Sequence, residues 1–158
     1  MPENKLRGSP IKPEITMNDP STSENSAPAK PQPRITSCAE YYWQQAGQNK
    51  LTMPYCRQCD KVFYYPRHWC PSCFNQDLGW QQVSGRGKVY SYSVIYQSPF
   101  PSYQADIPYV LAIIELEEGP RMMTNVVNCD AEHVRVDMAV QVTFERRGAM
   151  KIPQFEPR

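Results

Sequence analysis

Four cysteines near the middle of the chain constrain its fold more than any other feature. They form two Cys-x-x-Cys pairs separated by ten residues, Cys56, Cys59, Cys70 and Cys73. Two such pairs can place four thiolates at the corners of a tetrahedron, which is the geometry that a structural zinc ion prefers. Because four thiolates leave no coordination position for water or substrate, we expect the zinc to stabilise a small module.

Two disulfides, or four free buried thiols, are the alternatives to this zinc site. Nothing else in the sequence indicates secretion, and reduced thiols with this spacing commonly bind metal. A redox-active pair fits less well, because no strand and helix pattern surrounds either Cys-x-x-Cys. His68 is close in sequence, but four cysteines complete the ligand set, so we expect it at the surface or beside the ligands.

The residue after each pair is unusual for a zinc turn. Glycine is common there because a left-handed backbone lets N–H groups point at sulfur, whereas this chain has Asp60 and Phe74. Asp tolerates that conformation and Phe is strained by it. We therefore expect a distorted second turn, with Asn75 as the candidate for its left-handed residue.

Composition and charge exclude several classes of protein. The 158 residues include 17 Lys and Arg against 16 Asp and Glu, a net charge of +1, and no segment is basic enough to suggest nucleic-acid binding. No stretch reaches the roughly 18 apolar residues of a membrane span, and no apolar signal core follows the N-terminus. A cytoplasmic location is the expectation.

The chain divides into four predicted parts. The first 34 residues hold seven of the 16 prolines and few apolar residues, so they cannot offset their ordering entropy; a segment that folds along a partner is the alternative. We expect a disordered Pro-rich tail at 1–35, an N-terminal helix at 36–50, a zinc ribbon at 51–79 and a five-stranded barrel at 80–158.

The predicted helix spans Cys38 to Gln48. Ser37 and Glu40 have the spacing of a capping box, and Asn49 suits the left-handed position that ends a helix. The helix carries three adjacent aromatic residues, Tyr41, Tyr42 and Trp43. We expect these rings to pack on the zinc module or the following domain; a docking face for a partner is the alternative.

Strand patterns flank the first cysteine pair and recur through the chain after the second pair. Short antiparallel strands are expected at 51–55 and 62–66. Further strands are expected at 80–83, 89–96, 108–117, 121–127 and 139–146. Tyr90, Tyr92, Val94 and Tyr96 should share one face of the strand at 89–96, and the strand at 108–117 should be buried on both faces. Residues 128–133 can form only a turn or a single helical turn. About five strands without a long helix predict a mainly β protein with an OB-fold barrel.

No set of residues for catalysis is evident. Gly85, Arg86 and Gly87 lack the spacing and following helix of a phosphate loop, so a tight turn into a strand is expected. We interpret Cys129 as a packing residue and Cys38 as a partly buried free thiol. The chain is therefore not expected to be an enzyme by itself.

Several motifs together resemble a known family. They are the spaced cysteines, Ser84-Gly85-Arg86-Gly87, Pro108-Tyr109-Val110, and Gly119-Pro120-Arg121 leading to Thr124-Asn125. This combination resembles the zinc-ribbon plus OB-fold proteins called domain of unknown function thirty-five, over residues 37–158. Asp60, Phe74 and Asp137 depart from the glycines common in that family.

The resemblance implies a noncatalytic accessory subunit. Such a protein binds a thiolase-fold acyltransferase, thiolase or aldolase as a hetero-oligomer, and helps assemble it or shape its coenzyme A thioester path. The partner would supply the catalytic residues. The candidate coenzyme A or partner contacts are Gly85, Arg86, Gly87, Tyr92, Tyr96, Phe100, Tyr103 and Arg121, with both arginines as possible bidentate donors to phosphate.

A single-stranded nucleic-acid-binding module is the alternative function. OB-folds and zinc ribbons both serve that purpose, and aromatic side chains on strands can stack on bases. Residues 80–158 carry eight basic and nine acidic residues, so phosphates would find little net attraction there.

Overall fold

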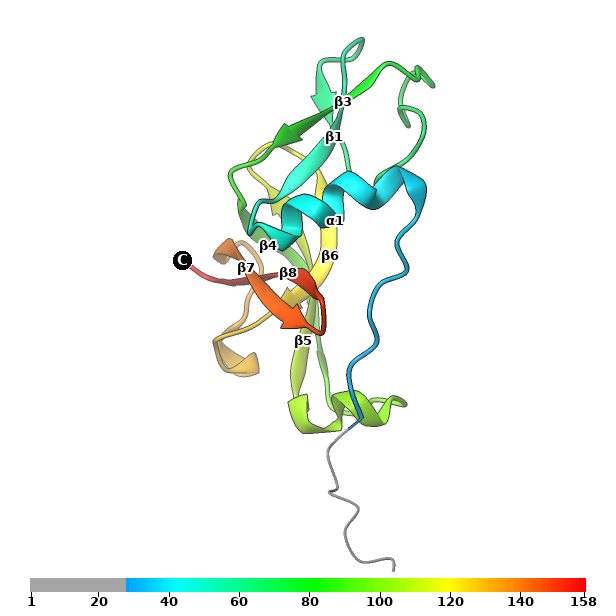
Figure 1. Ribbon diagram of the computed structural model, residues 1–158. Coiled ribbons are helices and arrows are strands. Elements are labelled where there is room, and N and C mark those ends of the chain that lie inside the picture. The colour runs from blue at the N-terminus through cyan, green and yellow to red at the C-terminus, as the bar shows by residue number, and fades with distance from the viewer. Residues whose placement is uncertain (1–27) are drawn as a thin grey trace, which may run out of the picture.

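The computed structural model describes residues 28–158, so most of the predicted tail at 1–35 lies outside the described residues. One short helix and eight strands make up the fold (Figure 1). A 3-10 turn, η1 (Ser37–Ala39), precedes α1 (Glu40–Gly47). The strands are β1 (Thr52–Cys56), β2 (Lys61–Val62), β3 (Leu78–Gln82), β4 (Arg86–Ile95), β5 (Tyr109–Leu116), β6 (Arg121–Val126), β7 (Ala139–Arg147) and β8 (Met150–Pro157).

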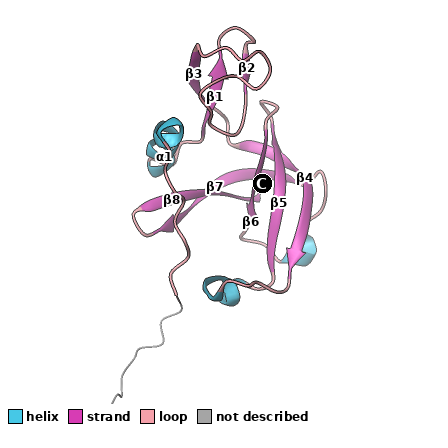
Figure 2. Ribbon diagram, turned by 90° about the vertical axis from the view of Figure 1, so that its right-hand side faces the viewer, coloured by secondary structure: helices cyan, strands magenta, loops and turns pink. Residues whose placement is uncertain are grey.

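Two β structures follow one another along the chain (Figure 2). A three-stranded sheet has the order β2-β1-β3, and a closed barrel has the order β4-β5-β6-β8-β7. The prediction of a mainly β protein with a zinc ribbon and a five-stranded OB-type barrel is confirmed. Among residues 28–158, no helix is long and apolar enough to cross a membrane.

The ribbon sheet differs from the prediction at both edges. β3 pairs with β1 along its whole length, which puts Trp80 opposite Pro54, so the strand predicted to open the barrel sequence lies in the ribbon sheet. β2 is only two residues long, and the chain leaves the sheet after one further bond, from the Phe63 N–H to the Pro54 carbonyl. The predicted strand at 62–66 is therefore wrong beyond Val62.

The helix starts later than predicted because the capping box does not form. No side chain caps either η1 or α1, and the first turn is instead closed by a hydrogen bond from the Ala39 N–H to the Thr36 carbonyl. Asn49 ends the helix with φ of 60°, as expected. Tyr42 and Ala46 are buried where α1 packs against β1 and β8.

A β-bulge at Tyr90 changes which residues of β4 share a face. Val89 lies opposite Ile114 and Ser91 lies opposite Ile113, which leaves Tyr90 without a partner on β5. Tyr92 then pairs with Ala112 on the buried face of β5. The predicted grouping of Tyr90 with Tyr92 is therefore wrong, since the bulge moves Tyr90 to the outer face.

β5 is buried on one face only. Alternate residues of β5 from Val110 to Leu116 line the core, whereas Ile113 on the other face is 37% exposed. The apolar run at 108–117 predicted burial on both faces, and that prediction is wrong because no layer of residues 28–158 covers the outer face. Ile113 instead lies beside Met123 of β6.

The fifth barrel strand is β8, which the sequence did not indicate. β8 forms a long antiparallel hairpin with β7 through a turn at Gly148, and it meets β6 in parallel at Val126 and Phe155. The Val127 N–H also bonds the Phe155 carbonyl at 2.7 Å. β8 therefore closes the barrel, and Phe155 lies fully buried at the closure.

Candidate functional site

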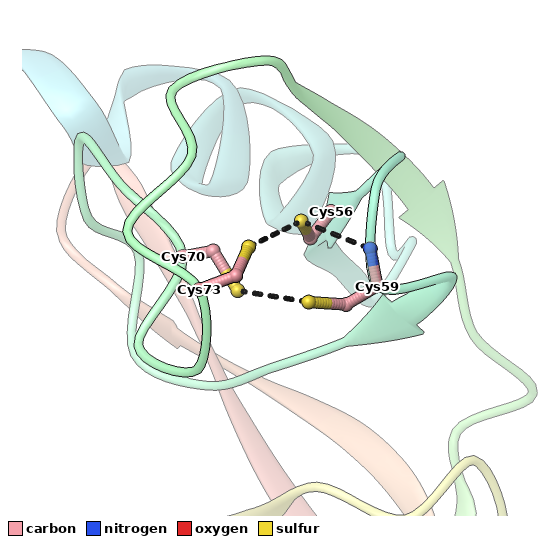
Figure 3. Close-up of side chains that lie close together, drawn as sticks. All are labelled: Cys56, Cys59, Cys70 and Cys73. Atoms are coloured by element: carbon pink, nitrogen blue, oxygen red, sulfur yellow. Dashed lines mark hydrogen bonds between the residues drawn. The ribbon is translucent and has the colours of Figure 1, made fainter.

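The four cysteines converge at one end of the ribbon sheet (Figure 3). Cys56 ends β1 and Cys59 follows in the turn to β2, while the other two lie in the loop before β3. The four sulfur atoms lie within 4.8 Å of one another. The Sγ atoms of Cys56 and Cys73 are 3.6 Å apart, and those of Cys70 and Cys59 are 3.9 Å apart.

These distances fit a tetrahedral zinc ion. Zn–S bonds of about 2.3 Å give sulfur–sulfur edges of about 3.8 Å in a regular tetrahedron. A disulfide needs sulfurs about 2 Å apart, and all four cysteines are free thiols. The four cysteines therefore fit a structural zinc site better than two disulfides. When bound, zinc would cross-link the loops that carry the cysteines and have no catalytic role, since four thiolates leave no position for water or substrate.

Backbone N–H groups favour thiolates at the site. The Cys59 N–H lies 3.4 Å from the Cys56 sulfur, and the Ser72 N–H lies 3.4 Å from the Cys70 sulfur. Hydrogen bonds from the Cys73 and Ser72 backbone lower the pKa of Cys70 to about 6. These contacts suit a deprotonated Cys70, whereas the neighbouring Cys73 thiol raises the pKa of Cys59 to about 12. A bound metal would let both thiols lose their protons.

Both residues after the cysteine pairs adopt the left-handed backbone. Asp60 has φ of 54°, as expected, and its carboxylate accepts a hydrogen bond from the Tyr55 hydroxyl. Phe74 has φ of 58°, so the proposal of Asn75 as the left-handed residue is wrong. The turn is fixed by backbone hydrogen bonds on both sides, from Phe74 N–H to Cys70 carbonyl and from Cys70 N–H to Asn75 carbonyl.

Replacing Phe74 with Gly should stabilise the protein. The side chain is 74% exposed, so little packing is lost, and a left-handed Cβ costs about 1 kcal/mol. We expect Phe74→Gly to raise the unfolding free energy by about 0.5 kcal/mol in urea titrations, after the entropy cost of glycine. Phe74→Ala is the control, since it removes the ring but keeps the Cβ. Equal unfolding free energies of Phe74→Gly and Phe74→Ala would show that a Cβ at this left-handed position causes no strain.

The remaining thiols and His68 do not join the metal site. His68 is exposed, with its ring 5.9 Å from that of Trp69. Cys38 is partly buried 3.3 Å from the Thr36 hydroxyl. Cys129 packs against the core, and burial raises its pKa, which matches a packing role.

The aromatic residues of α1 mainly pack inside the molecule. Tyr41 lies against Trp80 of β3 with ring centroids 5.1 Å apart. Tyr42 meets Trp43 edge to face at 4.9 Å and also contacts Tyr64 of the ribbon. The rings were predicted to pack on the zinc module or the following domain, and Tyr42 and Trp43 do so, whereas Tyr41 keeps part of its ring exposed.

The Gly85-Arg86-Gly87 segment is a tight turn into β4, as expected. Gly85 has φ of 72°, and a Cβ there would lie 2.3 Å from the Val142 side chain. A Cβ on Gly87 would lie 2.5 Å from the Glu115 carbonyl oxygen. Both glycines therefore permit close strand packing, which accounts for them without a phosphate ligand.

Both candidate arginines already have carboxylate partners. Arg86 Nε lies 3.1 Å from Glu117, and Arg121 donates to Glu115 at 2.8 Å and 3.0 Å. The Arg121 guanidinium also lies over the Tyr90 ring, 3.4 Å from its centroid. The hydrogen bond from Arg121 lowers the pKa of the Glu115 carboxyl.

The other candidate contacts lie toward the far end of the β4–β5 hairpin. Tyr96 and Phe100 are 66% and 59% exposed, and Tyr92 is partly exposed on β4. Tyr103 lies in a 3-10 turn, η2 (Pro101–Asp106), with its ring 6.4 Å from that of Phe100. The structure thus brings Phe100 and Tyr103 together, whereas Arg86 lies at the opposite end of β4.

The charged residues around Tyr103 were not among those predicted from the sequence. Arg147 donates to the Tyr103 hydroxyl at 3.1 Å and to Glu145 at 2.5 Å, and Lys30 lies over the Tyr103 ring. These residues are far apart in the sequence and form no motif. Only the spacing of two residues between Glu145 and Arg147, at the end of the strand predicted at 139–146, could have drawn attention to them.

A four-thiolate ribbon followed by a closed five-stranded barrel defines a zinc-ribbon plus OB-fold protein. Residues 43–79 match the family model described as ChsH2, rubredoxin-like zinc ribbon domain, and residues 80–145 match ChsH2, C-terminal OB-fold domain. A DUF35 domain-containing scaffold protein of Methanothermobacter thermautotrophicus is 37% identical over 106 residues, which cover 66% of this chain and 79% of that protein. The chain belongs to the DUF35 family.

Two further similarities are to chains whose names include an enzyme, an enoyl-CoA hydratase and an aldolase. The chain is 31% identical over 137 residues to a probable enoyl-CoA hydratase alpha subunit of Thermomonospora curvata. The aligned residues cover 86% of this chain but only 42% of that relative. A solved structure described as Ltp2-ChsH2(DUF35) aldolase superposes with a TM-score of 0.73 at 30% identity, covering 80% of this chain and 98% of that chain.

Proposed function

We propose that this protein is a noncatalytic accessory subunit of a thiolase-fold acyltransferase, thiolase or aldolase that acts on acyl-CoA. It would bind its partner as a hetero-oligomer, and help assemble the enzyme or shape its acyl-CoA path. The partner would supply the nucleophile and the acid–base residues. The zinc ribbon and barrel of this chain would supply a rigid binding surface.

One observation carries the proposal. The described fold matches 98% of the length of a DUF35 chain from a structure named as an aldolase together with Ltp2. The scaffold protein of Methanothermobacter and the hydratase subunit of Thermomonospora support the same role, since their names join this fold to assembly and to acyl-CoA chemistry. The chain spans less than half of the hydratase subunit, so its own reaction context is part of the proposal.

The exposed aromatic side chains of the hairpin are the proposed contact surface. Tyr96 and Phe100 lie exposed near the end of β4 and the following loop, where they bury little surface in the free subunit. Aromatic residues of this kind are enriched at the centres of protein interfaces. Arg86 and Arg121 remain the proposed contacts for coenzyme A phosphates. Each guanidinium would leave its glutamate partner and bind a phosphate in its place.

Copurification tests the proposal. The tagged chain, expressed in its native host, should retain a thiolase-fold acyl-CoA enzyme, identified by mass spectrometry and by activity on acyl-CoA. Replacing both Tyr96 and Phe100 with Ser should weaken the complex by about tenfold or more in titration calorimetry, since interface aromatic residues are typical hot spots. Val136→Ser, at another exposed apolar side chain, is the control.

The alternative functions give different results. Salt-sensitive retention on single-stranded DNA without any thiolase-fold partner would support the nucleic-acid-binding alternative. Acyl transfer or retro-aldol activity of the isolated chain would show that it is an enzyme. Either result would contradict the proposed accessory role.

A further inference from the structure

The segment before α1 crosses the surface of the barrel as an extended strap, residues 28–36. Figure 1 shows this segment, in blue, running from the start of α1 toward the turn η2. It has no helix or strand of its own, and most of its residues are exposed. Its position therefore depends on a few contacts that its side chains and carbonyl groups make with the barrel.

Lys30 makes the main contact between the strap and the barrel. Its Nζ lies 2.6 Å from Asp106 of η2 and 3.3 Å from Glu145 of β7, and 5.6 Å from the centre of the Tyr103 ring. The two carboxylates raise the pKa of Lys30 despite its partial burial. One ammonium group thus joins the strap to two separate elements of the barrel.

Arg147 contacts both Glu145 and the strap. Its side chain is only 12% exposed, and its guanidinium donates to Glu145, to the Tyr103 hydroxyl and, at 3.3 Å, to the Pro31 carbonyl of the strap. Gln154 of β8 also donates to Glu145 at 2.8 Å. Glu145 is therefore held in place by the barrel, so the binding position for Lys30 does not depend on the strap.

One residue of the strap, Lys30, lines a cavity of about 510 Å³. Lys30, Tyr103, Asp106 and Glu145 form part of its wall, and Val110 and Phe144 contribute apolar surface from the barrel. Cys129 belongs to the same wall. Movement of Lys30 would therefore remove part of the wall of a preformed, partly apolar cavity.

The sequence of the strap suits repeated docking and release. Pro28, Pro31 and Pro33 restrict the backbone to extended conformations, which lowers the entropy cost of docking. The contacts that hold it are partly exposed ion pairs, which are individually weak and screened by salt. A strap that folded as part of the core would instead bury apolar side chains.

From these contacts we infer that residues 28–36 form a reversible latch on the barrel cavity. Lys30 closes the latch by binding between Asp106 and Glu145, and its release opens the cavity to molecules outside. This inference is independent of the proposed accessory function, because every group involved belongs to this chain.

Lys30→Gln tests the latch in the full-length, zinc-containing protein. In a Cys38→Ser background, Cys129 should react with a thiol reagent about fivefold faster when Lys30 is Gln, since two partly exposed ion pairs are lost. Hydrogen exchange of the amides between residues 29 and 36 should accelerate by a similar factor. Raising NaCl to about 1 M should accelerate both rates in the protein with Lys30, and change them little in Lys30→Gln.

Lys88→Gln is the matched control. Lys88 also lies between two carboxylates, Asp137 and Glu115, but it pairs with Ala139 at the start of β7, whereas the strap contact at Glu145 lies near the end of that strand. It should leave both rates unchanged. Equal rates in Lys30→Gln and Lys88→Gln would overturn the latch. It would also be overturned if the strap amides exchanged faster in Lys30→Gln while the labelling rate of Cys129 did not depend on salt.

Discussion

Cys73→Ser is expected to reduce bound zinc from one ion per chain to almost none, and Cys56→Ser to do the same. Three thiolates and a weak hydroxyl ligand cannot hold zinc as tightly as four thiolates at this spacing. The ribbon has a small core of its own, in which Phe63 and Leu78 accompany the cysteines. It should therefore lose most of its stability with the metal, by several kcal/mol.

Two measurements check this expectation. Zinc is determined by mass spectrometry of the purified protein, and unfolding of the ribbon is followed by tryptophan fluorescence, since Trp69 and Trp80 lie in or beside it. Cys38→Ser and Cys129→Ser are the controls, because both remove a free thiol outside the cluster. Full zinc content in Cys56→Ser or Cys73→Ser would contradict the four-thiolate site.

The metal site could be predicted from the sequence because its information is local. Two Cys-x-x-Cys turns specify sulfur positions through a few backbone bonds each, and only a short hairpin must join them. The left-handed Phe74 was missed for the opposite reason. The sequence preference of one residue is worth about 1 kcal/mol, and the ligand turn, with its hydrogen bonds at Cys70, overrides it.

The features of the barrel that were missed depend on partners distant in the sequence. The bulge at Tyr90 is set by pairing with β5, and no local pattern marks where a regular alternation slips by one residue. Strand β8 contains two prolines, Pro153 and Pro157, which weaken its strand signal. The strap contact at Lys30 joins residues 115 positions apart, so only the folded chain brings it together.

Phe155→Ala is expected to cost about 3–5 kcal/mol of unfolding free energy, the range for removing a large aromatic side chain from a core. Phe155 is 0% exposed and is the largest fully buried side chain among residues 28–158. It lies opposite Val142 of β7 and Val126 of β6, where β8 closes the barrel. Removal of the ring would leave a cavity between three strands.

Urea unfolding followed by circular dichroism measures this cost, with Phe100→Ala as the control. Phe100 is the same residue type but 59% exposed in a loop, so its replacement should change the unfolding free energy by less than about 0.5 kcal/mol. Zinc content should stay at one ion per chain in both variants, since the ribbon has a separate core. A small cost for Phe155→Ala would mean that β8 does not close the barrel, because a frayed terminal strand would not bury this ring.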